Sequence, residues 1–275
     1  MTQAEAETDA RRLIERNHRQ EIMLSPSAVG KFRQCKRAFA FEYNEGLFAP
    51  PTGKQQFGTD VHSRLERWLR EAMPPDDTPE GRTALQGIAA GWLPAPDSRL
   101  LVEHRFFLPV DHGLTLNGII DCIAPPGLIG EEPLLIDHKT TSDLRWAKTP
   151  DQLAVDPQAI IYATWAMVNW NIRTVRARWI YYAASNPEDG PRKPRGSKPV
   201  EVSFHSRDDR FLGVVEGLLD DLYEMEIIRR ERVKGMTLPA SPESCELFGG
   251  CPHAARCALS SGDRLAAYME RETIV

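Results

Sequence analysis

The chain has 275 residues, a formal net charge of −5 and five cysteines. A length of this size corresponds to roughly one or two domains, and 41% hydrophobic with 27% charged residues is typical of a globular protein. These values exclude a membrane protein, a disordered chain and a small disulfide scaffold. The mild acidity also argues against a protein that coats nucleic acid by bulk charge.

The first part of the chain is expected to be helical. Residues 3–22 are charged and amphipathic, so we expect a helix there and neither a signal peptide nor a membrane anchor. Residues 25–27 (Ser-Pro-Ser) combine a hydroxyl cap with an early proline, which indicates the start of a second helix. A third helix is expected over residues 57–72, because two prolines follow it closely.

The middle of the chain changes to strands. Residues 100–109 and 114–123 read as two strands joined by a tight turn, and residues 133–138 form a short apolar strand of the buried kind. The order of elements predicts an α/β fold with a mixed central sheet flanked by helices. The later elements are a helix over 156–170, a strand over 174–183, a Pro-, Gly- and Arg-rich loop through 185–199, a strand over 200–204 and a helix over 207–234.

Two predicted strands end in carboxylates. Asp121 lies late in the second strand, Asp137 ends the third, and Lys139 follows two residues later. Residues two apart on a strand point to the same face, so Asp137 and Lys139 should project together. Paired carboxylates suit Mg²⁺ or Mn²⁺, and a nearby lysine can orient a water molecule or stabilise charge on a phosphate. Taken alone, this pattern also fits a simple salt bridge at the end of a strand.

The residues around this pattern resemble the PD-(D/E)XK nuclease superfamily, and within it the RecB-like nuclease domain. Five segments carry the resemblance in the expected order. They are residues 24–27, 57–62, 118–121, 136–140 and 158–162. The resemblance implies a restriction-endonuclease-like core in a single domain over 1–275. Its parts are a helical extension (1–23), the nuclease core (24–235) and a cysteine-containing segment (236–275).

The resemblance also implies a role for each site residue. His62 would be a metal ligand or orient one, Asp121 and Asp137 would be ligands of Mg²⁺ or Mn²⁺, and His138 would bind through its carbonyl. Lys139 would be the catalytic lysine. Gln158 and Tyr162 lie four residues apart, hence on one helix face, and would support the site and contact DNA. Asp137 stands where many relatives carry glutamate, and both residues supply a carboxylate.

Glu103 is a further candidate acid, because it lies on the strand before Asp121. An ion pair with its neighbours His104 and Arg105 is the simpler interpretation, and we rank it above a role in the site.

Four of the cysteines form a second pattern. Cys245, Cys251 and Cys257 lie in a Gly- and Pro-containing tail, and Cys35 lies far upstream. Spacing alone leaves zinc or an iron–sulfur cluster open, with Cys35 or His253 as the fourth ligand. A subset of RecB-like nucleases, including AddB-type enzymes and CRISPR-associated adaptation nucleases, carries one cysteine before the core and three after it. That resemblance implies a 4Fe-4S cluster, although the gap from Cys245 to Cys251 is longer than usual and zinc stays the alternative.

The remaining cysteine and the basic residues complete the predictions. Cys122 should face away from Asp121 and be a buried filler. A basic cluster in the 185–199 loop could hold a nucleic-acid backbone by charge. Its members are Arg192, Lys193, Arg195 and Lys198.

We therefore expect a metal-dependent DNA nuclease in a reducing, cytoplasmic compartment. The resemblance favours an exonuclease on single strands or DNA ends, in recombination, repair or CRISPR adaptation. Unwinding would require a helicase or recombination partner. The alternatives are a non-catalytic nucleic-acid-binding scaffold on the same fold and a zinc-stapled hydrolase.

Overall fold

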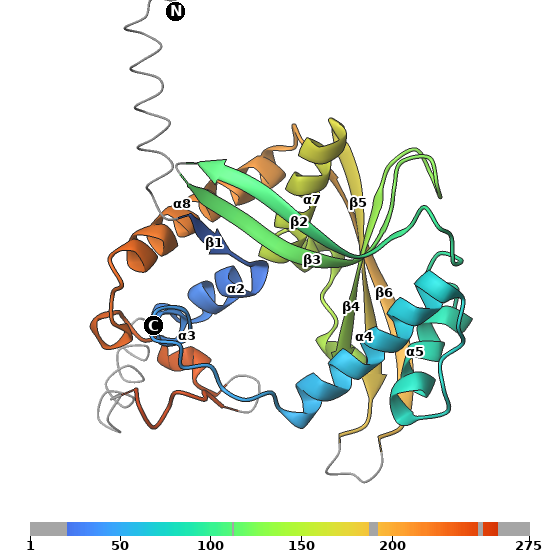
Figure 1. Ribbon diagram of the computed structural model, residues 1–275, viewed down its shortest axis with the longest axis horizontal. Helices are drawn as coiled ribbons and strands as arrows, with labels where there is room; N and C mark the ends of the chain where they lie inside the picture. Colours follow the sequence, from blue (N-terminus) through green and yellow to red (C-terminus); the bar gives the residue numbers. More distant parts are fainter. Residues whose placement is uncertain (1–20, 112, 187–191, 247–249, 258–275) are drawn as a thin grey trace, which may run out of the picture. The chain divides into compact units, whose positions relative to one another are not determined.

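The structure is a computed structural model that describes residues 21–111, 113–186, 192–246 and 250–257. Within these residues, a short strand and four helices are followed by three strands, two helices, two strands and a long helix, which is a mixed α/β arrangement (Figure 1). The strands are β1 (Ile22–Leu24), β2 (Leu101–Asp111), β3 (Leu114–Ala124), β4 (Leu134–Thr141), β5 (Thr174–Ala184) and β6 (Pro194–His205). The helices are α2 (Pro26–Gln34), α3 (Lys36–Tyr43), α4 (Gly53–Glu71), α5 (Pro79–Ala89), α6 (Pro150–Leu153), α7 (Pro157–Trp170) and α8 (Asp209–Arg230), with 3₁₀ turns η1 (Leu144–Trp146), η3 (Gly235–Thr237) and η4 (Pro242–Ser244).

The six strands form one mixed sheet in the order β1-β3-β4-β5-β6, with β2 paired to β3. Strand β4 is antiparallel to β3 and parallel to β5, so the expected mixed sheet is confirmed. Asp137 lies opposite Trp179 and Lys139 opposite Tyr181 in the parallel register. Parallel strands require a crossover, and α6 with α7 supplies the one between β4 and β5.

Helices cover both faces of β4 and β5. Helices α4 and α5 lie on one face (Figure 1), and their apolar residues share a core with Cys122, Ile136 and Tyr182. Helix α7 packs on β5 from the other side, where the ring of Tyr162 lies near that of Trp179. Successive residues of β4 face opposite helical layers. Ile136 packs in the core with α4 and α5, and Asp137 and Lys139 point toward α7.

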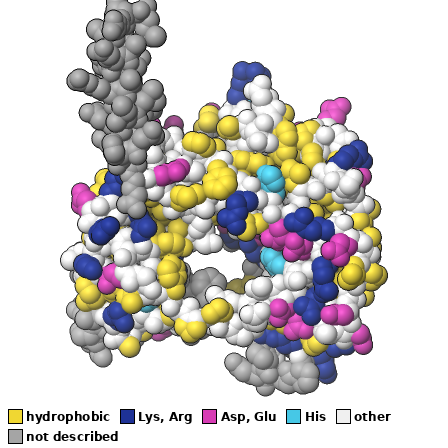
Figure 2. All heavy atoms as spheres, in the orientation of Figure 1, with side chains coloured by type: hydrophobic (Ala, Val, Ile, Leu, Met, Phe, Trp, Pro, Cys, Tyr) yellow, Lys and Arg dark blue, Asp and Glu magenta, His cyan; other side chains and the backbone are white. Residues whose placement is uncertain are grey.

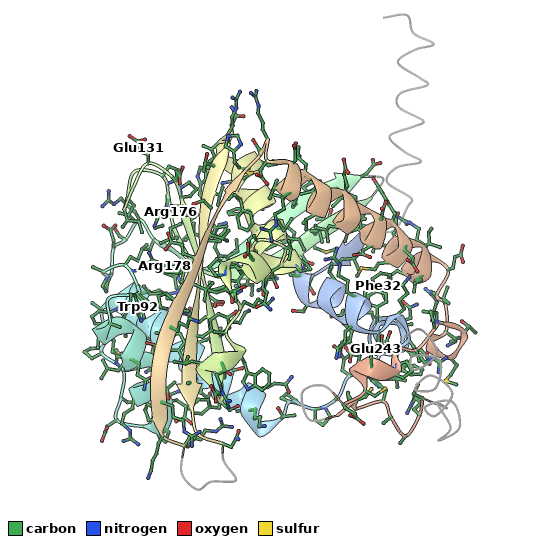
Figure 3. All side chains as sticks on the ribbon, turned by 180° about the vertical axis from the view of Figure 1, so that it is seen from behind. Phe32, Trp92, Glu131, Arg176, Arg178 and Glu243 are labelled. Atoms are coloured by element: carbon green, nitrogen blue, oxygen red, sulfur yellow. The ribbon has the colours of Figure 1, made fainter. Side chains whose placement is uncertain are left out.

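An ion-pair network ties the two last strands together. Arg176 and Arg178 on β5 both bind Glu201 on β6, and Arg178 also donates a 2.9 Å hydrogen bond to the carbonyl of Trp92 (Figure 3). This network fixes the β5–β6 register next to the catalytic candidates on β4.

The chain divides into two compact units. One comprises residues 1–50, 108–116 and 217–275, and the other residues 51–107 and 117–216. Within the first unit, Lys36 on α3 binds Glu224 on α8 at 2.6 Å, and the side-chain amide of Asn44 donates to the carbonyls of Ile228 and Val233. Phe32, shown in Figure 3, is buried in this unit.

The structure corrects several predicted elements. The helix after residue 25 breaks at Cys35, whose extended backbone makes it the N-cap of α3. The predicted 185–199 loop is wrong from Pro194 onward, because β6 begins there. Proline is tolerated in β6 because this strand lies at the end of the sheet. The predicted helix over 3–22 ends too late, since Ile22 lies in β1, and its residues up to 20 lie outside the described part. Helix α5 was not predicted.

No helix in the described part of the chain is both long and apolar enough to cross a bilayer.

Candidate active site

A closed hydrogen-bond network joins β4 to the first turns of α7. Lys139 Nζ lies 2.5 Å from Asp137 Oδ2 and donates to Gln158 Oε1 at 2.9 Å. The amide nitrogen of Gln158 donates to Asp137 Oδ1 at 2.9 Å and to the Tyr162 hydroxyl at 2.8 Å. Tyr162 in turn donates to the carbonyl of Ile119 at 2.7 Å. The structure therefore brings together four residues that the sequence singled out.

Helix α7 begins at a defined point because Asp156 caps it. The Asp156 carboxylate accepts from the backbone N–H of Ala159 at 3.0 Å and also binds Lys148. Pro157 occupies the first helical position, where its missing N–H costs nothing. This anchored start holds Gln158 over the Asp137–Lys139 pair.

Asp121 lies on the neighbouring strand and joins the same site. Its Oδ2 accepts from the backbone N–H of His138 at 2.7 Å and lies 3.5 Å from Nδ1 of His62 on α4. The N–H and C=O of one strand residue point to the same side, so the His138 carbonyl also points toward Asp121. The imidazole of His138 is buried, with Nδ1 3.3 Å from the Tyr182 hydroxyl and its ring edge-on to that of His62, 5.6 Å between centroids.

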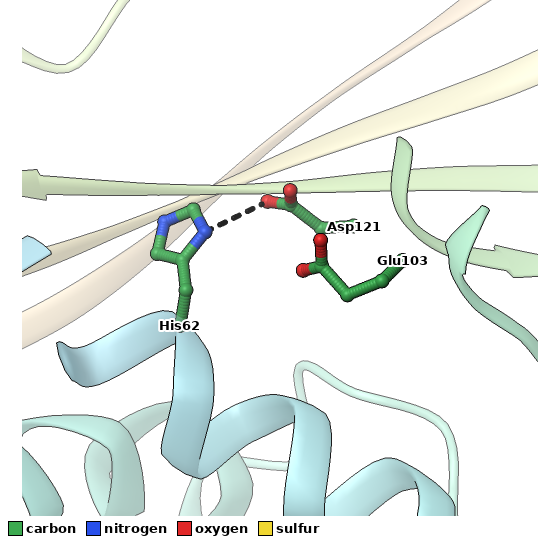
Figure 4. Close-up of side chains that lie close together, drawn as sticks. All are labelled: His62, Glu103 and Asp121. Atoms are coloured by element: carbon green, nitrogen blue, oxygen red, sulfur yellow. Dashed lines mark ion pairs between the residues drawn. The ribbon is translucent and has the colours of Figure 1, made fainter. Parts of the chain in front are cut away.

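Glu103 lies beside His62 and Asp121, whereas the sequence favoured an ion pair of Glu103 with His104 and Arg105. One ligand atom of each of His62, Glu103 and Asp121 lies within 4.8 Å of the other two. Figure 4 shows the three side chains and the ion pair between His62 and Asp121. Glu103 has a φ of 49°, a left-handed conformation that non-glycine residues rarely adopt. Its neighbour His104 stacks near Trp165, 5.2 Å between centroids. This backbone conformation interrupts the alternation of side-chain directions along β2. The period-two pattern of the sequence therefore could not show which way the Glu103 side chain points.

The site concentrates opposite charges in a partly buried place. Figure 2 shows acidic and histidine side chains next to one another where α4 crosses the sheet. Burial would lower the pKa of His62, but its hydrogen bond to Asp121 and the charges of Asp121 and Asp137 outweigh this and raise it. Burial is also the main cause that raises the pKa of Glu103, to about 7, with the charges of Asp121 and Glu66 adding to it.

Burial and neighbouring charges also shift the pKa values of Asp137 and Lys139. Complete burial and the nearby charge of Asp121 raise the pKa of Asp137 despite the attraction of Lys139. Burial works against the charge of Lys139, but Asp137 outweighs it and raises the lysine pKa. The pKa of His138 falls to about 3 because it is buried, so its ring is neutral. Burial makes the charged form of a carboxylate unfavourable, so a bound cation would stabilise that form.

The donor set fits a hard divalent cation. Asp121 and Glu103 offer carboxylate oxygens beside His62, and Asp137 adds a buried carboxylate whose Oδ2 is paired with Lys139. Oxygen ligands of this kind suit Mg²⁺ and Mn²⁺, whereas sulfur is absent from this group of side chains. His62 adds one nitrogen ligand to the set.

Comparison with known families decides the identity of the fold. The family model described as the PD-(D/E)XK nuclease superfamily matches residues 23–98 and 83–258, which is most of the chain. The chain belongs to the PD-(D/E)XK nuclease superfamily. No curated protein matches it. The crystal structure of SSO0001 matches with a TM-score of 0.42 and 14% identity, over 75% of this chain and 78% of that one.

In this member of the superfamily the four cysteines predicted as metal ligands lie in the first compact unit, whereas the acids of the candidate site and Cys122 lie in the second. The Ser244 hydroxyl donates to the carbonyl of Gln34 at 2.8 Å, which brings the residue before Cys245 to the residue before Cys35. The Cys257 sulfur accepts from Arg37 at 3.3 Å, and the N–H of Cys251 donates to the carbonyl of Cys245 at 2.8 Å. The four predicted ligands therefore come from segments that contact one another.

His253, the alternative fourth ligand, is buried, with Nε2 3.1 Å from Glu42 Oε1. The fifth cysteine, Cys122, is fully buried in the sheet core, as predicted, and burial raises its pKa to about 12.

The predicted basic cluster lies at the start of β6. Lys198 pairs in register with Tyr181, which is itself opposite Lys139. Arg192 lies over the ring of Phe57 at 4.3 Å and donates to the carbonyl of Gly53 at 3.4 Å. Because β6 is antiparallel to β5 and β5 is parallel to β4, the first residues of β6 lie at the same end of the sheet as the last residues of β4. The basic cluster therefore lies at that end.

Proposed function

We propose that the protein is a metal-dependent DNA nuclease that hydrolyses phosphodiester bonds, and that it acts as an exonuclease on single strands or DNA ends. The observation that carries this proposal is the Asp137–Lys139 pair held by Gln158 next to Asp121. The membership of the superfamily supports nuclease activity in general.

We assign the cation site to carboxylates from two strands. Asp121, Asp137 and the carbonyl of His138 would hold Mg²⁺ or Mn²⁺, and His62 with Glu103 would complete the set or hold a second ion. A bound divalent cation polarises the phosphate and makes a bound water more acidic. Burial raises the pKa of Asp137 and so disfavours its charged form, which a bound cation would stabilise.

The other residues position the reacting groups. Lys139 has an ammonium group within reach of both Asp137 and Gln158, so it can orient the attacking water and stabilise charge on the phosphate. Gln158 fixes the directions of Asp137 and Lys139, and Tyr162 fixes Gln158. We propose that Gln158 and Tyr162 are the helix residues nearest the DNA strand.

We further propose that Cys35, Cys245, Cys251 and Cys257 hold a 4Fe-4S cluster that closes the first compact unit. The contacts between Ser244 and Gln34 and between Cys257 and Arg37 support it. With this closure the chain would act as one nuclease domain, and a helicase or recombination partner would supply unwound DNA.

Cleavage of end-labelled DNA tests the proposal. Purified protein is incubated with single- and double-stranded DNA in Mg²⁺, in Mn²⁺ and in chelator, together with Asp137→Ala, Lys139→Ala and the exposed-acid control Asp77→Asn. We expect cleavage that requires the cation, that is lost in the first two variants and that persists in the control. Equal cleavage by all variants would refute the assigned site, and cleavage by none would favour the scaffold alternative.

A further inference from the structure

A single large apolar side chain stands in solvent just after the catalytic strand. Trp146 ends the 3₁₀ turn η1 and is 74% exposed, the highest value among the large apolar residues of the described part. Burying an aromatic side chain of this size is strongly favourable in water. An indole left this exposed next to a proposed active site is therefore a candidate for a contact with a ligand.

The backbone under Trp146 is firmly held. The Asp143 carboxylate accepts from the backbone N–H of Arg145 at 2.8 Å, and the Thr141 hydroxyl donates to the carbonyl of Asp143 at 3.0 Å. The N–H of Trp146 donates to the same carbonyl at 3.2 Å, and Ala147 after it is buried. A ring presented on an anchored turn loses little conformational entropy on binding.

Cationic side chains flank this turn. The Arg145 side chain is 86% exposed, although its guanidinium contacts Asp143. The hydrogen bonds from Arg145, together with the charge of Arg195, hold the pKa of Asp143 below its usual value. The start of β6 lies against η1, because a Cβ on Gly196 would be 3.5 Å from Leu144 Cδ1. The turn that carries Trp146 thus has Arg145 on it and the start of β6, with Arg195, packed against it.

The turn is also close to the cleavage site along the chain. Trp146 follows Lys139 by seven residues, which span at most roughly 25 Å. A strand whose phosphate lies at Lys139 can therefore reach the indole within a few nucleotides.

We infer that Trp146 is a stacking platform for an unpaired base of a single-stranded nucleic acid, with Arg145 and Arg195 beside its phosphates. This inference rests on the proposed nuclease function and adds a residue that binds a base of its single-stranded substrate. An aromatic ring stacks on the face of any base, but in a duplex those faces are covered by neighbouring pairs. The combination of an exposed ring and flanking cations is the arrangement that single-strand binding proteins use.

The test compares a normal strand with one that has no bases. Binding of fluorescent oligothymidylate, and of an equally long strand of abasic sugars, is measured by anisotropy in chelator. The proteins are the wild type, Trp146→Ala, Trp146→Phe and the control Phe48→Ala, which removes another exposed aromatic ring (60% exposed) from the other unit. Circular dichroism confirms that each variant is folded.

We expect the wild type to prefer the normal strand by on the order of tenfold. Trp146→Ala should lose most of this preference, Trp146→Phe should keep part of it, and Phe48→Ala should keep all of it. Equal preference in the wild type and Trp146→Ala would overturn the inference, as would no preference in the wild type.

Cleavage assays separate this inference from the proposed function. Trp146→Ala should still cleave in Mg²⁺, with a raised KM and a nearly unchanged kcat. A wild type that never cleaves but prefers bases through Trp146 would refute the nuclease and keep the platform. A wild type that cleaves without base preference would refute the platform and keep the nuclease.

Discussion

Gln158 donates a hydrogen bond of 2.9 Å to Asp137 and, through its other amide atom, accepts one of 2.9 Å from Lys139. One neutral side chain therefore sets the directions of both charged groups. The amide is suited to this task because it offers a donor to the acid and an acceptor to the lysine. Neither a glutamate nor a leucine at this position could satisfy both partners.

Replacing this amide should impair catalysis more than binding. We expect Gln158→Ala to lower the single-turnover cleavage rate by about 10- to 100-fold, as loss of an orienting partner commonly does. Its DNA affinity should change little. The control is Gln56→Ala, an exposed glutamine on α4 that bonds only to Asp60 among the described contacts. A rate within twofold of the wild type would show that Asp137 and Lys139 need no such support.

Glu103 should make the metal-free protein less stable at high pH. Its pKa is about 7 in the folded state, against an ordinary value of 4.5. The folded state therefore binds this proton more tightly, and the stability gained from it is lost as the pH rises from 4.5 through 7. For this half-buried group, Glu103→Gln should raise the free energy of unfolding by about 1 to 2 kcal/mol at pH 8 and by much less at pH 5.

Urea unfolding in chelator at the two pH values measures this effect. The exposed Glu131→Gln is the matched control, and it should show the same stability as the wild type at both. A Glu103→Gln gain that is equal at pH 5 and pH 8 would contradict the ionisation argument. Excess Mn²⁺ should stabilise the wild type more than Glu103→Gln, because the cation needs the ionised carboxylate.

Loss of one proposed cluster ligand should remove the metal. Cys35→Ser should abolish the brown visible absorbance and reduce the iron content to near zero, because three ligands cannot close the site. Cys122→Ala is the control, since this thiol is buried in the sheet core and should leave the iron content unchanged. The measurement is the iron and zinc content of anaerobically purified protein. One equivalent of zinc in the wild type would support a zinc site in place of the cluster.

The basic cluster should contribute to the salt dependence of DNA binding. Neutralising Lys193, Arg195 and Lys198 with glutamine should reduce the slope of log affinity against log salt by about 2 for a single strand. Arg192 is left in place because it packs on Phe57. The charge-matched control changes three exposed arginines of the same unit, Arg67, Arg82 and Arg99. Slopes that are equal in the two triple variants would show that the cluster does not touch the backbone.

The sequence allowed the sheet and its central acids to be predicted because these depend on local pattern. Apolar runs ending in Asp121 and Asp137 indicated strands, and the i, i+2 rule placed Lys139 beside Asp137. The four-residue spacing of Gln158 and Tyr162 indicated a shared helix face, and the two side chains bond to each other.

Other features depend on tertiary contacts that no local pattern carries. The strand at Pro194 forms because β5 offers it a partner, despite unfavourable residues. The break at Cys35 occurs within a run that reads as one helix. Glu103 reaches the site only through its left-handed backbone, which the sequence does not encode as a recognisable signal.

The position of Cys35 has a consequence for the order in which the protein matures. In the chain, 210 residues separate it from Cys245. At a synthesis rate of about 5 to 20 residues per second, roughly 10 to 40 s pass between the two. Strand β1 precedes Cys35 and the other five strands are made in that interval, so any group that needs all four thiolates is inserted after every strand of the sheet has been made. Maturation of the cysteine site would therefore be a late step, performed on a chain that already carries its complete set of acids.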